Sequence, residues 1–97
     1  MSTRAYEMMI IVDPDVDDRQ VPATLERYLT VVKNAQGSVD NIDVWGRRRM
    51  AYDIKKKSEG IYVIVYFQSD SATAQEMDRQ LGLSEVILRT KLLRATP

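Results

Sequence analysis

Two long extended segments joined by a short polar loop restrict the possible folds of this chain more than any other feature. Residues 39–54 form the first segment, in which Met50, Tyr52 and Ile54 keep the two-residue period of a strand. Residues 61–68 form the second, which is apolar or aromatic as far as Phe67. Residues 55–60 make the turn, so the pattern predicts a β-hairpin. Gly46 inside the first strand indicates a bulge or a close backbone approach.

Four further segments flank this hairpin. Residues 4–12 are nearly all apolar in their second half and predict a central strand, which Asp13-Pro14-Asp15 ends. Apolar residues at helical spacing predict a helix within residues 17–36, ended by Gly37. Because proline is tolerated only in a first helical turn, Pro22 indicates that the regular part begins after Asp17.

The last two segments repeat the order of helix and strand. Residues 71–81 predict a helix capped by Ser71 and ended by Gly82. Residues 85–94 predict a strand with Val86, Leu88 and Leu92 on one side, and with Arg89 and Lys91 on the other.

The order strand, helix, strand, strand, helix, strand indicates an α+β fold of one domain over residues 1–97. Right-handed crossovers turn it into a ferredoxin-like sandwich, with a four-stranded antiparallel sheet and both helices packed on one face. The first and third strands lie in the middle. Alternation places five apolar or aromatic side chains on the open face, which suggests a docked partner. These are Met9, Ile11, Tyr62, Ile64 and Tyr66.

Composition excludes several classes of chemistry. The chain has no cysteine and no histidine. It therefore lacks the residues that form disulfides, thiolate ligands, the usual zinc sites and histidine-based triads. No stretch reaches the roughly 18 apolar residues of a membrane span, and no signal-peptide pattern opens the sequence. We therefore expect a cytoplasmic protein with no bound metal or cofactor.

Charge is balanced in total but segregated along the chain. Fourteen basic and fourteen acidic residues cancel, yet four aspartates crowd residues 13–18 and six basic residues crowd residues 47–57. The aspartates begin like a calcium loop, but Asp18 and Thr24 stand where such a loop needs glycine and glutamate. A turn followed by a helix cap explains them better.

The basic segment Arg47-Arg48-Arg49 to Lys55-Lys56-Lys57 has two interpretations. It can be a solvated edge strand protected from self-pairing by its charge, or a surface for phosphate, whose geometry matches arginine forks. The sheet does not resemble an RNA-recognition motif, because Glu59, Ile61 and Val63 replace a basic residue and two stacking aromatics. Trp45, Tyr52, Tyr62 and Tyr66 can be packing residues or partner anchors, whereas Tyr28 and Phe67 are predicted core residues.

Several short motifs together resemble the bacterial small-subunit ribosomal protein S-six family. They are Tyr6-Glu7 in the first strand, the Asp-Pro after it, the run from Gly46 to Lys55, Gly60-Ile61-Tyr62, and Arg89 in a basic last strand. The resemblance covers residues 4–94. Met50 stands where leucine is usual, a swap of similar volume.

The resemblance implies a structural constituent of the small ribosomal subunit, not an enzyme, without a small-molecule substrate or a membrane role. It implies binding to the central domain of 16S ribosomal RNA together with ribosomal protein S-eighteen, during assembly of the platform. The RNA-side residues carried over by position are Arg4, Tyr6, Arg47, Arg48, Arg49, Lys55, Lys56, Arg89, Lys91 and Arg94. The residues expected to meet the partner protein are Met9, Trp45, Tyr62, Ile64 and Tyr66. The alternative is a ferredoxin-like module that binds a small ligand or a second copy of itself, without a role on RNA.

Overall fold

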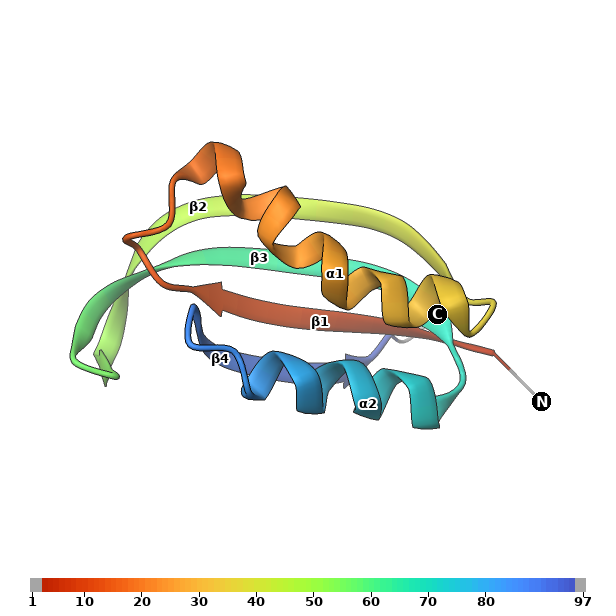
Figure 1. The fold of residues 1–97 in the computed structure, drawn as a ribbon. Helices are drawn as coiled ribbons and strands as arrows, with labels where there is room; N and C mark the ends of the chain where they lie inside the picture. Colours follow the sequence, from red (N-terminus) through yellow and green to blue (C-terminus); the bar gives the residue numbers. More distant parts are fainter. Residues whose placement is uncertain (1–2, 96–97) are drawn as a thin grey trace.

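The computed structural model describes residues 3–95 and confirms the ferredoxin-like arrangement (Figure 1). Its elements are β1 (Arg4–Val12), the short 3-10 helix η1 (Asp18–Gln20), α1 (Val21–Asn34), β2 (Ser38–Ile54), β3 (Lys57–Ser69), α2 (Ser71–Gly82) and β4 (Ile87–Arg94). The strands pair in the antiparallel order β2-β3-β1-β4, so the first and third strands are central, as predicted. One domain over residues 1–97 stays a prediction, because residues 1, 2, 96 and 97 lie outside the described part.

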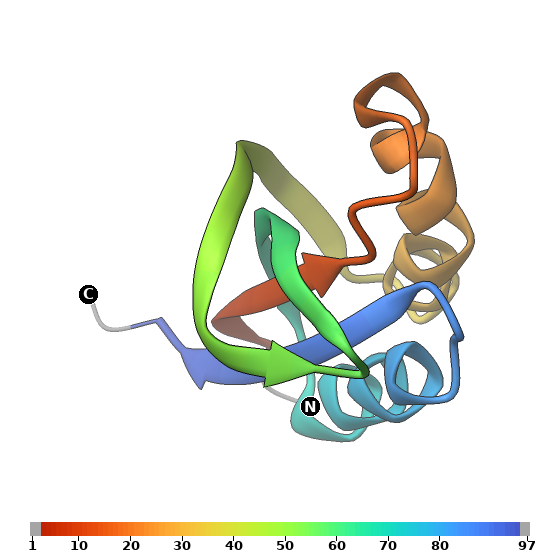
Figure 2. The same ribbon diagram turned by 90° about the vertical axis from the view of Figure 1, so that its left-hand side faces the viewer.

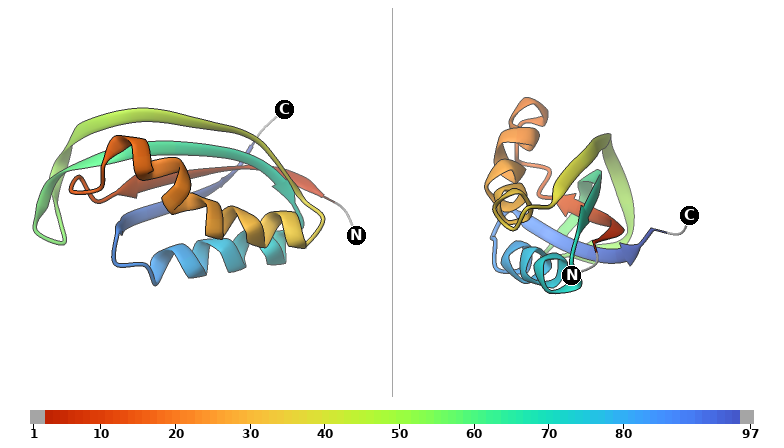
Figure 3. Two further views of the ribbon diagram at one scale, coloured as in Figure 1. Left: turned by 45° about the horizontal axis from the view of Figure 1, so that its top comes forward. Right: turned by 90° about the vertical axis from the view of Figure 1, so that its right-hand side faces the viewer.

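Both helices cover the same face of the curved sheet (Figure 3). Their apolar stripes meet the inward side chains of β1 and β3 in a single main cluster of buried residues. Phe67 is fully buried there, and its ring stacks on Tyr6 with the ring centroids 5.6 Å apart. Burial of an aromatic ring of this size stabilises the fold by about 2 to 3 kcal/mol. The predicted core positions of Phe67 and Tyr28 are confirmed.

The helix ends differ from the predicted ones in two details. Gln36, not Gly37, takes the left-handed backbone conformation after α1, with φ of 65°. Gly37 is instead a close-approach glycine, since an added Cβ would lie 2.4 Å from the Gln68 carbonyl oxygen. Asp70, not Ser71, caps α2 by accepting a hydrogen bond from the Thr73 amide at 2.7 Å.

The turn of the hairpin is shorter than residues 55–60. Ile54 pairs with Lys57, so the turn consists of Lys55 and Lys56 alone. Their φ angles of 50° and 65° are those of a type I′ turn, which normally uses asparagine and glycine. The sequence predicted a turn here but not its two-residue length, because two lysines are not a signal for a type I′ turn.

The hairpin curls over one end of the open face (Figure 2). Arg49 pairs with Glu59 and Ile54 with Lys57, so residues 50–53 of β2 face only Ser58 on β3. The longer outer strand bends the hairpin in this way. Gly60 makes the approach possible, because a Cβ there would lie 2.3 Å from Ile11 Cγ2.

A second, smaller cluster of buried residues forms under the curl. It consists of Ile11, Met50 and Leu88, with Met9, Ile54 and Tyr62 packed against it. Leu88 therefore lies on the open side, not with Leu92 as predicted, because the pairing of β1 with β4 shifts between Ile11 and Val12. The open face is consequently covered at this end and bare only beyond it.

Candidate nucleic-acid interface

A bulge at Gly46 distributes the three arginines of β2 between the two sides of the sheet. Val44 pairs with Val63 and Gly46 with Tyr62, so Trp45 is the extra residue, and Gly46 has φ of 95°. After the bulge, Arg48 pairs with Gly60, which is two residues before Tyr62 on β3. The Arg48 side chain therefore lies on the open side, as that of Tyr62 does. Arg47 and Arg49 alternate to the helix side. The predicted bulge is confirmed, and it decides the side that each arginine takes.

Arg47 is held by the loop between β1 and η1. Its guanidinium donates hydrogen bonds to the carbonyl oxygens of Pro14 and Val16, the latter at 3.3 Å. The same group forms an ion pair with Asp18, with Nη2 3.1 Å from Oδ1. Arg47 was among the predicted RNA-side residues, but these three contacts direct its side chain towards the loop.

Lys57 makes the matching contact from β3, which was not expected from the sequence. Its Nζ lies 2.7 Å from Asp15 Oδ2 and 3.8 Å from Asp13 Oδ1. The hydrogen bond with Asp15 raises the pKa of Lys57, and it lowers the pKa of Asp15. The acidic segment is therefore not a cap alone, since it pairs with the basic hairpin. A contact across 42 residues of sequence has no local signal by which it could have been found.

Arg48 lies on the open side beside an exposed aromatic ring. Its guanidinium carbon is 5.4 Å from the centre of the Trp45 ring, a cation–π distance. The Trp45 indole Nε1 donates a hydrogen bond to Asp43 Oδ2 at 2.9 Å. Half of the Trp45 surface remains exposed, so the ring is held in place without being buried.

Two further cations lie across the sheet on β4. Arg89 pairs with Ile11 and Lys91 with Met9, so both side chains belong to the open side, as predicted. Arg89 Nη1 donates a hydrogen bond to the Tyr52 hydroxyl. Tyr52 is 61% exposed and contributes to this contact, whereas Met50 and Ile54 pack under the hairpin.

The tip of the hairpin brings two lysines next to the same strand. Lys55 Nζ donates a hydrogen bond to the Ile87 carbonyl oxygen at 3.0 Å, which fixes the tip against β4. Lys56 follows it in the turn and is exposed. Lys55, Lys56 and Arg89 therefore lie at one end of the open face.

Three other predicted RNA-side residues lie at the opposite end of the sheet. Tyr6 is only 7% exposed and belongs to the main core, so its ring is not available at the surface. Its position follows from the alternation of β1, in which Tyr6 and Met8 both face the helices. Arg4 and Arg94 are exposed near the ends of their strands, in the alternation of the helix side.

The predicted partner-binding residues do lie together on the open side. Met9 pairs with Ile64, and Ile64 pairs in turn with Asp43. Tyr62 and Tyr66 flank Ile64 on β3 and are half-buried, whereas Ile64 is 9% exposed and offers little surface. An apolar and aromatic centre thus lies between Asp43 with Trp45 on the β2 edge and Arg89 with Lys91 on the β4 edge.

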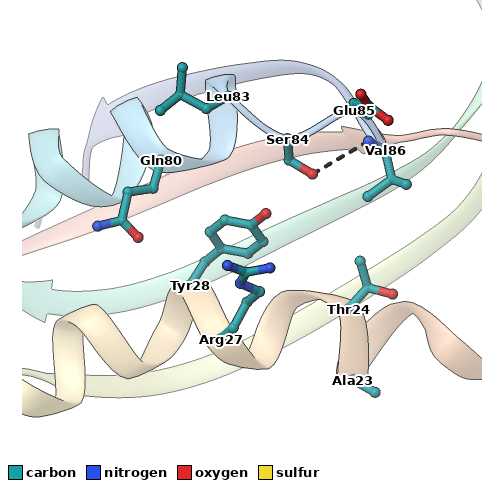
Figure 4. A pocket seen from close by; sticks show the side chains of 9 residues that line it. All are labelled: Ala23, Thr24, Arg27, Tyr28, Gln80, Leu83, Ser84, Glu85 and Val86. Carbon is teal, nitrogen blue, oxygen red and sulfur yellow. Dashed lines mark hydrogen bonds between the residues drawn. The ribbon is translucent and has the colours of Figure 1, made fainter.

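A groove lies on the other side of the molecule, between α1 and the loop after α2 (Figure 4). Its volume is about 690 Å³, and its lining mixes polar and apolar side chains. Arg27 lies over the Tyr28 ring at 5.4 Å, and Leu83 at the rim is 72% exposed. None of the predicted site residues lines this groove.

Candidate metal ligands do not gather in residues 3–95. No cluster of three acidic, histidine or cysteine ligands occurs among these residues. No helix in that range is long and apolar enough to span a membrane. The arrangement of cations around an aromatic centre suits the binding of a polyanion and a protein surface, since both depend on charge and contact area.

Comparisons with known proteins agree in pointing to one family. The model of the family described as ribosomal protein S6 matches residues 5–94. Small ribosomal subunit protein bS6 of Micrococcus luteus is 64% identical over 91 residues, which are 94% of this chain and 90% of that protein. The corresponding protein of Cutibacterium acnes is 57% identical and is covered to 95% of its length, with 94% of this chain aligned. The crystal structure of 30S ribosomal protein S6 from Thermotoga maritima superposes with a TM-score of 0.85 at 30% identity, covering 97% of this chain and 89% of that one.

Proposed function

This chain belongs to the ribosomal protein S6 family, and on that premise we propose that it binds the central domain of 16S ribosomal RNA together with ribosomal protein S-eighteen. It is a protein of the small ribosomal subunit, and its relatives are structural ribosomal proteins, not enzymes. The proposed role is to hold RNA and protein side by side during assembly of the platform.

One observation carries the proposal. The open side combines an aromatic centre, Tyr62 and Tyr66, with cations on the two edge strands, Arg48 on β2 and Arg89 with Lys91 on β4. Hydrogen bonds and ion pairs to phosphate fix the position of RNA, whereas large amphipathic rings supply most of the free energy at protein interfaces. We therefore assign the cations to the RNA and the aromatic centre, with Met9 and Trp45, to the partner protein.

The proposed RNA-side set differs from the set expected from the sequence. Lys55, Lys56, Arg4, Arg49 and Arg94 are exposed and stay in it. Tyr6 leaves it because the ring is buried, and Arg47 leaves it because the loop holds the guanidinium. Ile64 stays in the partner-side set because it lies between the two tyrosines on the open side of β3, although little of it is exposed.

Binding across a salt series tests the assignment of the cations. The triple variant Arg48→Gln, Arg89→Gln, Lys91→Gln is compared with the original chain on a transcript of the 16S central domain, in the presence of ribosomal protein S-eighteen. Loss of up to three phosphate contacts lowers the slope of log K against log salt by about 2 to 3. A triple variant on the helical side, Arg27→Gln, Lys33→Gln, Arg79→Gln, has the same change of charge and serves as the control. Equal losses in both triple variants, or none in the first, contradict the assignment.

The aromatic centre has a separate test. The variant Tyr62→Ser, Tyr66→Ser removes two half-buried rings of the open side. Loss of anchor residues at an interface centre commonly costs more than about 2 kcal/mol, so affinity for ribosomal protein S-eighteen falls by at least about 30-fold. Leu83→Ser removes an exposed apolar side chain from the helical side and is the control. Unchanged affinity of the double variant rejects the open side as the protein-binding surface.

A further inference from the structure

We infer that residues 13–18, which are the loop after β1 and the first residue of η1 and are called the loop below, act as an internal competitor for RNA. Its aspartates hold Arg47 and Lys57, so the basic hairpin meets RNA only with its other cations. This inference rests on the proposed function, which identifies the polyanion as RNA. It adds that Arg47 and Lys57 are withheld from that RNA. Asp15 and Asp18 then limit which cations can bind RNA, and Arg47 and Lys57 hold the loop against the hairpin.

The geometry of the loop supports this role. Three ion pairs join it to neighbouring strands of one hairpin. Asp18 lies 3.1 Å from Arg47, and Asp15 and Asp13 lie 2.7 Å and 3.8 Å from Lys57. The carbonyl oxygens of Pro14 and Val16 accept two more hydrogen bonds from Arg47. Anionic oxygens and carbonyl oxygens therefore occupy the donors that would otherwise be offered to phosphate oxygens.

The contacts are exposed, so a polyanion could reach these cations if the loop released them. The side chains of Arg47 and Lys57 are 42% and 32% exposed, and that of Asp15 is 79% exposed. Exposed ion pairs contribute little to stability, which makes a purely stabilising role a weak explanation for two of them at one place. Because the loop is attached to the chain, a diffusing polyanion has to displace it at every encounter.

The loop acts on one side of the hairpin only, because the bulge places Arg47 and Arg48 on opposite sides of the sheet. Arg48 belongs to the open side and the described structure gives it only the Trp45 ring as a partner, whereas Arg47 belongs to the helix side and is held. The loop thus neutralises two of the hairpin cations that face away from the aromatic centre, Arg47 and Lys57. An RNA attracted to the hairpin is directed to the side on which the partner protein is proposed to bind.

Binding of an unrelated RNA by the protein alone is the direct test. The variant Asp15→Asn, Asp18→Asn removes the carboxylates that lie nearest to Lys57 and Arg47, and it is titrated with poly(U) at 50 mM salt. Each additional phosphate contact on a single strand adds about 0.7 to the salt slope, which is about 8-fold in affinity at 50 mM. We expect tighter binding by up to roughly 60-fold and a slope steeper by up to about 1.4, the upper figures applying if both cations gain a phosphate contact. Circular dichroism and the urea midpoint establish that the variant is folded.

A matched control separates this effect from net charge. The variant Glu26→Gln, Glu76→Gln also removes two negative charges, so the net charge rises by two as in the loop variant. It releases Lys33 and Arg79 from ion pairs on the two helices. We expect a much smaller gain, because those cations lie on separate elements away from the hairpin. The inference is overturned if the control gains as much as the loop variant, or if the loop variant gains nothing.

A second measurement uses the central-domain transcript with ribosomal protein S-eighteen. Arg47→Gln leaves the salt slope unchanged when the loop is intact, whereas Arg48→Gln lowers it by about 1. A slope lowered by about 1 in Arg47→Gln shows direct phosphate contact and overturns the inference. If the original chain does not bind this transcript at all, the proposed function fails, while the poly(U) titration still decides the role of the loop.

Discussion

The substitution Gly60→Ala tests whether the hairpin folds tightly over the open side. Gly60 is buried, and a Cβ added there would lie 2.3 Å from Ile11 Cγ2, 3.5 Å from the Val12 carbonyl oxygen and 3.7 Å from Leu88 Cδ1. Ile11 is itself only 3% exposed, and Cγ2 is attached at the branched Cβ, so this methyl group has little room to move. The backbone of the hairpin has to shift instead.

The expected magnitude combines two opposing effects. Overpacking of a buried site costs about 1 to 3 kcal/mol. Replacing glycine in a strand recovers about 0.5 to 1 kcal/mol of conformational entropy. Because the clash is as close as 2.3 Å, the cost should lie in the upper part of that range, at about 2 to 3 kcal/mol. We therefore expect a net loss of about 1 to 2 kcal/mol, or a fall in Tm of about 4 to 16 °C for a domain of this size.

A double-mutant cycle with Ile11→Ala identifies the cause. Ile11→Ala removes the methyl group that clashes, and on its own it costs about 2 to 5 kcal/mol by leaving a cavity. In that background Gly60→Ala should be neutral or stabilising, because the new methyl group fills part of the space. Urea denaturation followed by circular dichroism gives the four free energies of unfolding. A neutral Gly60→Ala in the original chain, or an equal cost in both backgrounds, refutes the packing of the hairpin on β1.

Three more predictions concern stability. Lys56→Gly relieves the left-handed turn residue with φ of 65° and should raise the free energy of unfolding by about 0.5 to 1 kcal/mol in urea denaturation, whereas Ser58→Gly two residues on should lower it. Asp70→Ala removes the cap of α2 and should cost about 1 kcal/mol by the same measurement, with Ser71→Ala nearly neutral. Arg79 beside Glu76 lowers the pKa of that carboxyl to about 2, so its contribution to stability is present above pH 4.5 and is lost as the pH falls towards 2. Stability measured against pH should therefore fall more steeply in the original chain than in Glu76→Gln over that interval, and parallel curves would contradict the assigned ion pair.

Patterns within single elements predicted most of the fold. The apolar run of β1, the helical spacing of residues 21–34 and the alternation of β3 each follow from which faces are buried, and they placed Phe67 and Tyr28 correctly. Gly46 also indicated its bulge, because a glycine inside a strand has few other reasons to be there. These signals are local, so the sequence carries them in full.

Contacts between distant segments could not be predicted in the same way. The ion pair of Lys57 with Asp15, the contact of Arg89 with Tyr52 and the approach of Gly60 to Ile11 all depend on how far the hairpin bends. That bend arises from the unequal pairing of residues 50–53, which no periodicity reveals. For the same reason the sequence could single out the arginines of β2 only as a group of cations, and it could not separate Arg47 from Arg48.

Chemical footprinting of lysines, measured by acetylation rate and mass spectrometry, shows which side of the sheet meets RNA and the partner protein. The protein is labelled alone and in complex with ribosomal protein S-eighteen and the 16S central-domain transcript. We expect acetylation of Lys91 and Lys56 to slow on complex formation, that of Lys33 on α1 to stay the same, and that of Lys57 to be slow in both states because Asp15 holds it. Protection of Lys33 and Lys57 by the complex, with Lys91 unchanged, would show that RNA and partner bind the helical side, and it would contradict the account.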